Sequence, residues 1–247
     1  MVPPDPVSHF STVARAYAAC RPSYPPSLFD WLASVAPARS LAWDCGAGSG
    51  QAARDLASRF GRVVATDASR AQLGSGVAGA CTWAATAERS GIRSGRVDLI
   101  AVAQALHWFD LTAFYAEARR VLRPGGVLAA WTYADPRLDG AAGRVLDRFA
   151  AEMRPWWPAQ RELVDSGYQT IAFPFDELAA PGFALTADWP LDALVGYLGT
   201  WSAVGACRAG RGIDPLPAVR TGLADVWGDP LESRRMVWRL ALRAGRV

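Results

Sequence analysis

Apolar runs alternating with amphipathic segments dominate the first 133 residues of the chain. Short, mostly apolar runs that predict buried strands lie at 41–43, 63–65, 82–85, 97–103 and 127–133. Apolar residues at helical spacing predict helices between these runs, at 28–36, 52–56, 70–79 and 112–122. Five alternations of strand and helix predict an α/β fold with an open parallel sheet and right-handed crossovers.

The pattern changes character after residue 133. A helix is expected over 138–153, a strand over 183–189, helices over 192–201 and 217–227, and a weakly alternating final strand over 236–243. No repeat or low-complexity linker divides the chain. We therefore expect one domain over 1–247, whose parts are an N-terminal lead and lid (1–26), a ligand-binding core (27–133), cap insertions with the sixth strand (134–230) and the last strand (231–247).

Glycines at alternate positions follow the first predicted strand. Asp44 ends that strand, and Gly46, Gly48 and Gly50 lead into a helix whose free N–H groups can meet a polar ligand. Gln51 follows, so the spacing differs from the G-x-G-x-x-G of dinucleotide-binding loops. A carboxylate two residues before the loop would repel a pyrophosphate but suit a cation. The motif therefore disfavours a nicotinamide-dependent oxidoreductase.

Polar residues also stand at the ends of the other predicted strands. Asp67 ends the second strand, where a carboxylate can accept both hydroxyls of a ribose. Glu88 follows the third strand, and residues 104–108 follow the fourth. The carboxyl ends of parallel strands meet at one edge of a sheet, so these residues are expected to face one crevice.

Composition and charge exclude several classes of function. The net charge of +3 is too small to indicate binding to nucleic acid or to a membrane, and no apolar run spans a bilayer. Four scattered cysteines and two histidines favour neither a disulfide framework nor a metal site. The Pro-rich start, without a basic region or an apolar core, is unlike a signal peptide, so a cytoplasmic protein is expected.

Five stretches together resemble one branch of the class I S-adenosylmethionine-dependent methyltransferases, the trans-aconitate methyltransferase-like proteins (methyltransferase type 11). These stretches are Y-A-A-C-R-P-S-Y-P at 17–25, the glycine motif at 44–51, D-A-S at 67–69, A-Q-A-L-H-W-F-D at 103–110 and R-V-L-R-P-G-G at 120–126. The resemblance implies a Rossmann-like, seven-stranded mixed sheet with helices on both faces, an N-terminal helical lid and helical C-terminal insertions. Residues 183–189 and 236–243 would form its last two strands, and the final strand would be antiparallel.

The resemblance also implies a cofactor, S-adenosyl-L-methionine, and its product, S-adenosyl-L-homocysteine. Asp44 with the loop would hold the methionine part, Asp67 and Ala68 the ribose, and Gln104 and Ala105 the floor, while Tyr17 and Arg21 would cover the site. Adenine would lie against Gln72, Ala87 and Glu88, although many relatives carry Met in place of Gln72 and an acid in place of Thr86. The loop residues implied are Gly46, Ala47, Gly48 and Gly50.

The methyl acceptor is less constrained than the cofactor. Transfer from a sulfonium needs mainly positioning, but a hydroxyl or ammonium acceptor must also lose a proton. His107 is a candidate base, or it packs structurally between strand and helix. The residues expected near the substrate are His107, Trp108, Arg161, Trp201, Arg208 and Arg211.

We therefore predict a small-molecule methyltransferase, a monomer or homodimer, that methylates oxygen on a carboxylate or a hydroxyl. The alternatives are N- or C-methylation of a small metabolite, or a protein that binds the cofactor without catalysis. Aromatic residues of the C-terminal part could line the acceptor pocket or form the core of a helical cap.

Overall fold

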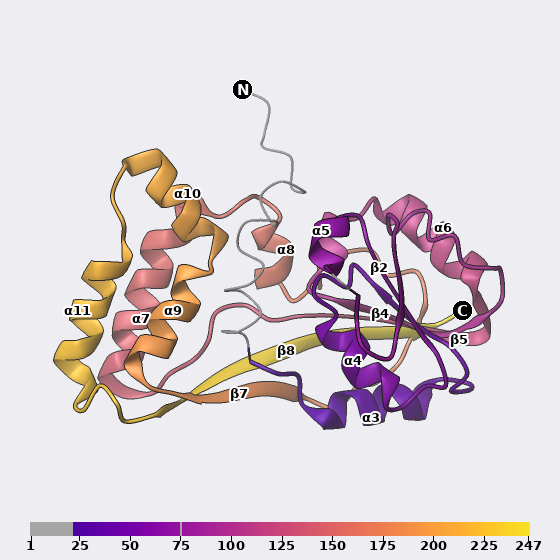
Figure 1. The fold of residues 1–247 in the computed structure, drawn as a ribbon, viewed down its shortest axis with the longest axis horizontal. Coiled ribbons are helices and arrows are strands. Elements are labelled where there is room, and N and C mark those ends of the chain that lie inside the picture. The colour runs from indigo at the N-terminus through magenta and orange to yellow at the C-terminus, as the bar shows by residue number, and fades with distance from the viewer. Residues whose placement is uncertain (1–21, 75) are drawn as a thin grey trace.

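The computed structural model describes residues 22–74 and 76–247 (Figure 1). Parallel strands form the middle of its sheet, in the order β3-β2-β1-β4-β5. Their bounds are Ala42–Cys45 for β1, Val63–Asp67 for β2, Cys81–Ala84 for β3, Val97–Ala103 for β4 and Leu122–Thr132 for β5. The predicted α/β fold is confirmed.

Helices cover both faces of this sheet, as predicted. Leu99 and Ala101 of β4 belong to the apolar cluster that includes α3 (Pro26–Val35) and α4 (Gln51–Ala57). Ile100 and Val102 belong to the cluster that includes α6 (Leu111–Val121). Successive side chains of a strand point to opposite faces, so the continuous apolar run of β4 supplies both layers.

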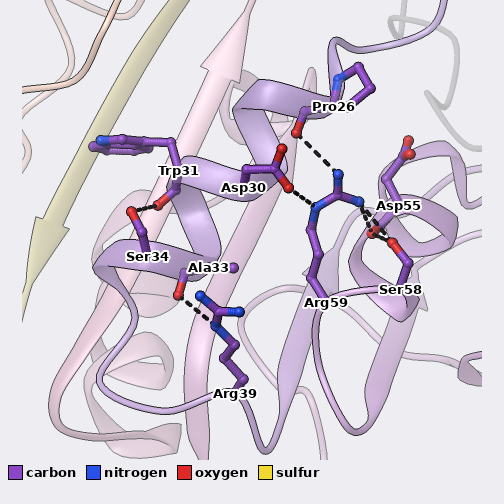
Figure 2. Close-up of polar contacts among 9 residues, drawn as sticks. All are labelled: Pro26, Asp30, Trp31, Ala33, Ser34, Arg39, Asp55, Ser58 and Arg59. Carbon is purple, nitrogen blue, oxygen red and sulfur yellow. Dashed lines mark hydrogen bonds and ion pairs between the residues drawn. The ribbon is translucent and has the colours of Figure 1, made fainter.

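Arg59, just after α4, ties that helix to the start of α3 (Figure 2). Its Nε lies 2.8 Å from the Asp30 carboxylate, and its Nη1 donates to the carbonyl of Asp55. Its Nη2 donates to the carbonyl of Pro26 at 3.3 Å. These contacts position α4, whose first residue follows the glycine loop directly.

The far edge of the sheet differs from the prediction. Strand β8 (Arg234–Arg246) pairs antiparallel with β5 through residues 241–246 and with β7 (Phe183–Trp189) through residues 234–240. The strand that completes the sheet edge beside β8 is β6 (Asp176–Glu177), and β7 lies off that path. The antiparallel last strand is confirmed. The strand predicted over 183–189 is confirmed as β7, which pairs antiparallel with β8 as expected. The described sheet has eight strands rather than seven, because the sequence analysis missed β6, a two-residue strand with no alternation to read.

A helical lobe stands at the end of the β7–β8 ribbon (Figure 1). The helices of the lobe are α7 (Gly140–Met153), α9 (Leu191–Gly199), α10 (Ser202–Arg211) and α11 (Leu216–Trp227). The short 3-10 helix η2 (Arg154–Trp156) follows α7, and α8 (Arg161–Asp165) lies between the lobe and the sheet. The sequence reading missed α8 and α10. It also extended α5 (Arg70–Leu73) to residue 79, whereas the helix ends at Gly74, where φ is positive. None of the helices in the two described ranges has the length and apolar composition of a membrane span.

Candidate functional site

A cavity of about 620 Å³ opens at the carboxyl ends of β1, β2 and β4. Ten of the fourteen residues expected around a cofactor line it: Gly46, Ala47, Gly48, Asp67, Ala68, Gln72, Ala87, Glu88, Gln104 and Ala105. Of the other four, Tyr17 and Arg21 lie outside the described residues, and Asp44 and Gly50 do not line the cavity. The topology thus brings together residues that are as far apart in the sequence as Gly46 and Ala105.

Two glycines of the loop differ in what surrounds them. A Cβ at Gly48 would meet no atom of the described residues within 4 Å, and the residue lines the cavity. A Cβ at Gly50 would come within 2.2 Å of Val77, so this glycine is required for packing. Both have positive φ, which a residue with a side chain rarely adopts.

Asp67 is held by the backbone around it. One carboxylate oxygen accepts a hydrogen bond from the Gly48 N–H at 2.9 Å, and the other accepts one from the Ser69 N–H at 2.8 Å. Burial raises the pKa of Asp67, and these two hydrogen bonds partly oppose that shift. Each oxygen has a further lone pair, so the oriented carboxylate can still accept hydrogen bonds from a ligand.

Asp44 is fully buried at the end of β1. Neither of its carboxylate oxygens accepts a hydrogen bond from the part of the chain that the structure describes. Burial raises the pKa of Asp44 to about 7; the Ala53 N–H, which faces the group without hydrogen-bonding geometry, partly opposes this. A buried carboxylate without a partner is costly, and a cationic ligand group beside it would reduce that cost.

The loop after β3 forms another wall, with Thr86, Ala87 and Glu88. The Glu88 carboxylate accepts a hydrogen bond at 3.0 Å from the N–H of Asp110, the residue that caps α6. Further along the loop, buried Ser90 donates its N–H and its hydroxyl to Glu117 of α6. The loop is therefore anchored to α6 on both sides of residue 89.

His107 lies in the 3-10 helix η1 (Leu106–Trp108), and its neighbour Trp108 lines the cavity while His107 itself does not. The Nδ1 atom of His107 lies 2.9 Å from the hydroxyl of Tyr168. Burial, together with a smaller contribution from the charge of Arg161, lowers the pKa of His107 to about 4. The imidazole is therefore neutral near pH 7.

The other residues expected near the substrate are dispersed. Arg161 makes ion pairs with Asp135 and Asp165 at 2.8 and 2.7 Å, and its guanidinium stacks over Trp157. Trp201 is buried beside Trp157 in the helical lobe. Arg208 and Arg211 are exposed in the last turn of α10, where Arg208 pairs with Asp214. Of these four residues, Arg161 is the one whose charge lowers the pKa of His107.

Several cavity residues were not predicted, among them Tyr24, Gln51, Ser69 and Phe109. All four lie inside stretches that carried the family resemblance, which is the signal that could have identified them. Tyr24 is buried, and its ring packs edge-on against Trp131 at 5.6 Å.

Comparison with known proteins identifies the family. Residues 43–130 match the model of a methyltransferase domain. A protein of Dictyostelium discoideum named as a methyltransferase is 31% identical over 221 residues, which are 87% of this chain and 84% of the relative. A Mycobacterium tuberculosis protein, also named a methyltransferase, is 35% identical over 72% of this chain and 78% of its own length.

A solved structure from Anaeromyxobacter dehalogenans, assigned to the type II methyltransferases, is 48% identical. It covers 92% of this chain and 97% of its own, with a TM-score of 0.87. The match extends across the helical lobe as well as the sheet. The chain belongs to the class I S-adenosylmethionine-dependent methyltransferases.

Proposed function

We propose that this protein transfers a methyl group from S-adenosylmethionine to an oxygen of a small molecule, with a carboxylate as the acceptor. The observation that carries the proposal is the cavity at the strand ends, which ten of the predicted cofactor residues line. Resemblance to the trans-aconitate branch adds support for a carboxylate, whereas the matched relatives identify the class of enzyme alone.

The residues around the cavity fit this cofactor in chemical terms. Asp67 offers oriented oxygens for the two ribose hydroxyls, and the open backbone at Gly48 leaves room for the methionine part. Asp44 offers a buried negative charge for the ammonium group. When bound, the cofactor supplies a methyl group on a positively charged sulfonium, whose sulfur leaves readily as a neutral thioether.

The surroundings of His107 argue against a general base. A base must become an imidazolium, and both burial and the nearby positive charge of Arg161 oppose that charge. The hydrogen-bond partner of the ring is a neutral phenol, which does not stabilise an imidazolium as a carboxylate would. A carboxylate acceptor is already nucleophilic near neutral pH and needs no base.

Arg161 is the cation best suited to hold such an acceptor. Two of its three nitrogens are engaged with Asp165 and Asp135, and stacking on Trp157 orients the guanidinium plane. Nη1 makes no hydrogen bond to any residue within 22–74 or 76–247, so it can donate to a ligand. Arg208 and Arg211 are less suitable because they are exposed on α10.

Product analysis tests this function. The protein is incubated with S-adenosylmethionine and matched panels of small carboxylic acids, alcohols and amines, and products are read by mass. A methyl ester that hydrolyses in mild base supports the proposal. With that acceptor, His107→Ala should lower kcat/KM less than about tenfold, and the rate should stay flat across the histidine range of pH.

Other products would favour the alternatives. A base-stable ether, with a loss of roughly 10²–10⁴-fold in His107→Ala, would favour a hydroxyl acceptor and a general base. A methylated amine or carbon would favour N- or C-methylation. Binding of S-adenosylhomocysteine without turnover on any panel would favour a cofactor-binding protein that lacks catalysis.

A further inference from the structure

Tyr168 is a buried residue beside the candidate site that the sequence analysis did not single out. It has no exposed surface, and its φ of 64° is unusual for a residue with a side chain. Arg243 of β8 donates to its carbonyl at 3.1 Å, which helps to hold the backbone in this conformation. A strained backbone held by surrounding contacts is a reason to ask what the side chain does.

The hydrogen bonds around Tyr168 indicate where its proton goes. Gln104 donates its amide N–H to the carbonyl of Tyr133 at 3.0 Å, which identifies its Oε1 as an acceptor. The other polar groups near the phenol are the backbone N–H groups of Leu106 and His107, which can only donate, and the hydroxyl of Thr132. That hydroxyl donates its own proton to the Gln104 Oε1 at 2.5 Å. Within the described ranges, the acceptor at hydrogen-bonding distance and geometry from the Tyr168 hydroxyl is Nδ1 of His107, at 2.9 Å.

We propose that Tyr168 is a positioning residue: its hydroxyl donates to Nδ1 of His107 and holds the ring as the tautomer that carries hydrogen on Nε2. Burial raises the pKa of Tyr168, so the phenol keeps its proton. Nε2 of His107 makes no hydrogen bond to the described residues, and the ring is partly exposed next to Trp108, which lines the cavity. The ring nitrogen available to a ligand is therefore a donor.

This assignment gives His107 a different part in the reaction from that of a base. An Nε2–H donor can hold an acceptor oxygen in place, and the nearby Arg161 can supply the compensating charge. That part rests on the proposed function, whereas the tautomer does not. Among the described residues, Tyr168 and Arg161 are the titratable and charged groups that face His107. Asp135 and Asp165 are ion-paired to Arg161 and act on His107 through it.

Nitrogen NMR of the histidine rings tests the assignment without an acceptor. The chain has two histidines, so ¹⁵N-labelled protein carrying His9→Gln reports His107 alone. We expect Nε2 to be protonated and Nδ1 to be an unprotonated nitrogen that accepts a hydrogen bond. In Tyr168→Phe, the Nδ1 signal should move toward that of a free imine nitrogen, and the His107 pKa should rise.

A matched control is Tyr115→Phe, which removes the hydroxyl that Tyr115 donates to the carbonyl of Ala172 and should leave both nitrogen signals unchanged. A proton on Nδ1 in the parent protein overturns the proposal, as does a Tyr168→Phe spectrum identical to that of the parent. Should Tyr168→Phe fail to fold, the parent spectrum alone still decides the tautomer. Failure to find a methyl ester would overturn the proposed function and leave the tautomer assignment standing.

Discussion

Two aspartates at the ends of neighbouring strands show how surroundings separate the chemistry of identical side chains. Asp67 receives two backbone hydrogen bonds and faces the cavity, so its carboxylate is oriented for ligand hydroxyls. Asp44 is fully buried and lacks a hydrogen-bond partner in the described chain. We expect Asp67 to contribute mainly directional hydrogen bonds, and Asp44 mainly charge.

Replacing Asp67 with alanine should weaken binding of S-adenosylhomocysteine by about 1–3 kcal/mol, because hydrogen bonds from the ligand to a partly buried acceptor are lost. Calorimetry at pH 7 measures this as a rise of roughly 5–150-fold in Kd. Asp192→Ala, at an exposed site of α9, is the matched control and should bind like the parent. An unchanged Kd in a folded Asp67→Ala protein would remove Asp67 from the site.

The buried Asp44 should make the stability of the unliganded protein depend on pH. Its pKa is raised from 3.8 to about 7, so between these values the folded protein holds a proton that the unfolded chain has lost. Its contribution to the free energy of unfolding therefore falls as pH rises from 4 to 7. Urea unfolding at pH 5 and pH 8 should show a smaller decrease in Asp44→Asn than in the parent. If the free energy of unfolding fell by the same amount from pH 5 to pH 8 in both proteins, the raised pKa of Asp44 would be contradicted.

At the scale of elements, α6 supports the loop that forms the Glu88 wall of the cavity. Glu117 of α6 accepts hydrogen bonds from the backbone and hydroxyl of Ser90, and it pairs with Arg120 one turn later at 2.6 Å. The Arg120 hydrogen bond, together with those from Ser90, lowers the pKa of Glu117 to about 2. The helix and the loop are therefore joined through one charged group.

Glu117→Gln should lower the free energy of unfolding at pH 7 by about 1–3 kcal/mol, because charge-assisted hydrogen bonds are replaced by weaker ones. The folded pKa is depressed below the ordinary 4.5, so the contribution is present above that value and is lost as pH falls toward 2. Urea unfolding should therefore show the two proteins converging at low pH. If the free energies of unfolding of the two proteins differed by the same amount at pH 7 and pH 3, the hydrogen bonds of the Glu117 carboxylate would not account for the loss of stability.

At the scale of the whole molecule, the helical lobe and the sheet share one apolar core. A single cluster of buried residues runs from Leu28 of α3 through Trp131 of β5 and Trp238 of β8 to Leu223 of α11. Trp238 is fully buried and donates its indole N–H to the hydroxyl of Tyr197 in the lobe. The β7–β8 ribbon thus connects the two parts through packing as well as through the chain.

Trp238→Ala should cost about 3–5 kcal/mol of stability, as expected for removing a large buried aromatic side chain. The parent should unfold in one cooperative transition, because no gap in the core separates lobe from sheet. Far-ultraviolet and near-ultraviolet circular dichroism, followed together during denaturation, measure both effects. Two separate transitions in the parent would show that the lobe folds independently.

Local patterns were sufficient to predict the central sheet, and together with the family resemblance they identified about half of the residues that line the cavity. Buried parallel strands are apolar on both faces, so 97–103 could be recognised without a partner strand. Glycine spacing and the acids at strand ends placed Asp67, Gly48 and Gln104 together, because parallel topology brings strand ends to one edge. Residues 1–21, including Tyr17 and Arg21, lie outside the described structure, so the lid remains a prediction.

Other features depend on contacts between residues that are distant in sequence. Tyr168 forms a hydrogen bond with His107, which is 61 positions away in the sequence, and no local periodicity predicts such a pair. The short β6 has no readable alternation, and its place at the sheet edge depends on pairing with β8. The low pKa of His107 arises from burial and from Arg161, which are properties of the packed molecule. The sequence by itself thus determined the family and the edge of the sheet at which the cavity lies, whereas the tertiary structure decided the environment, and hence the chemistry, of the residues at that edge.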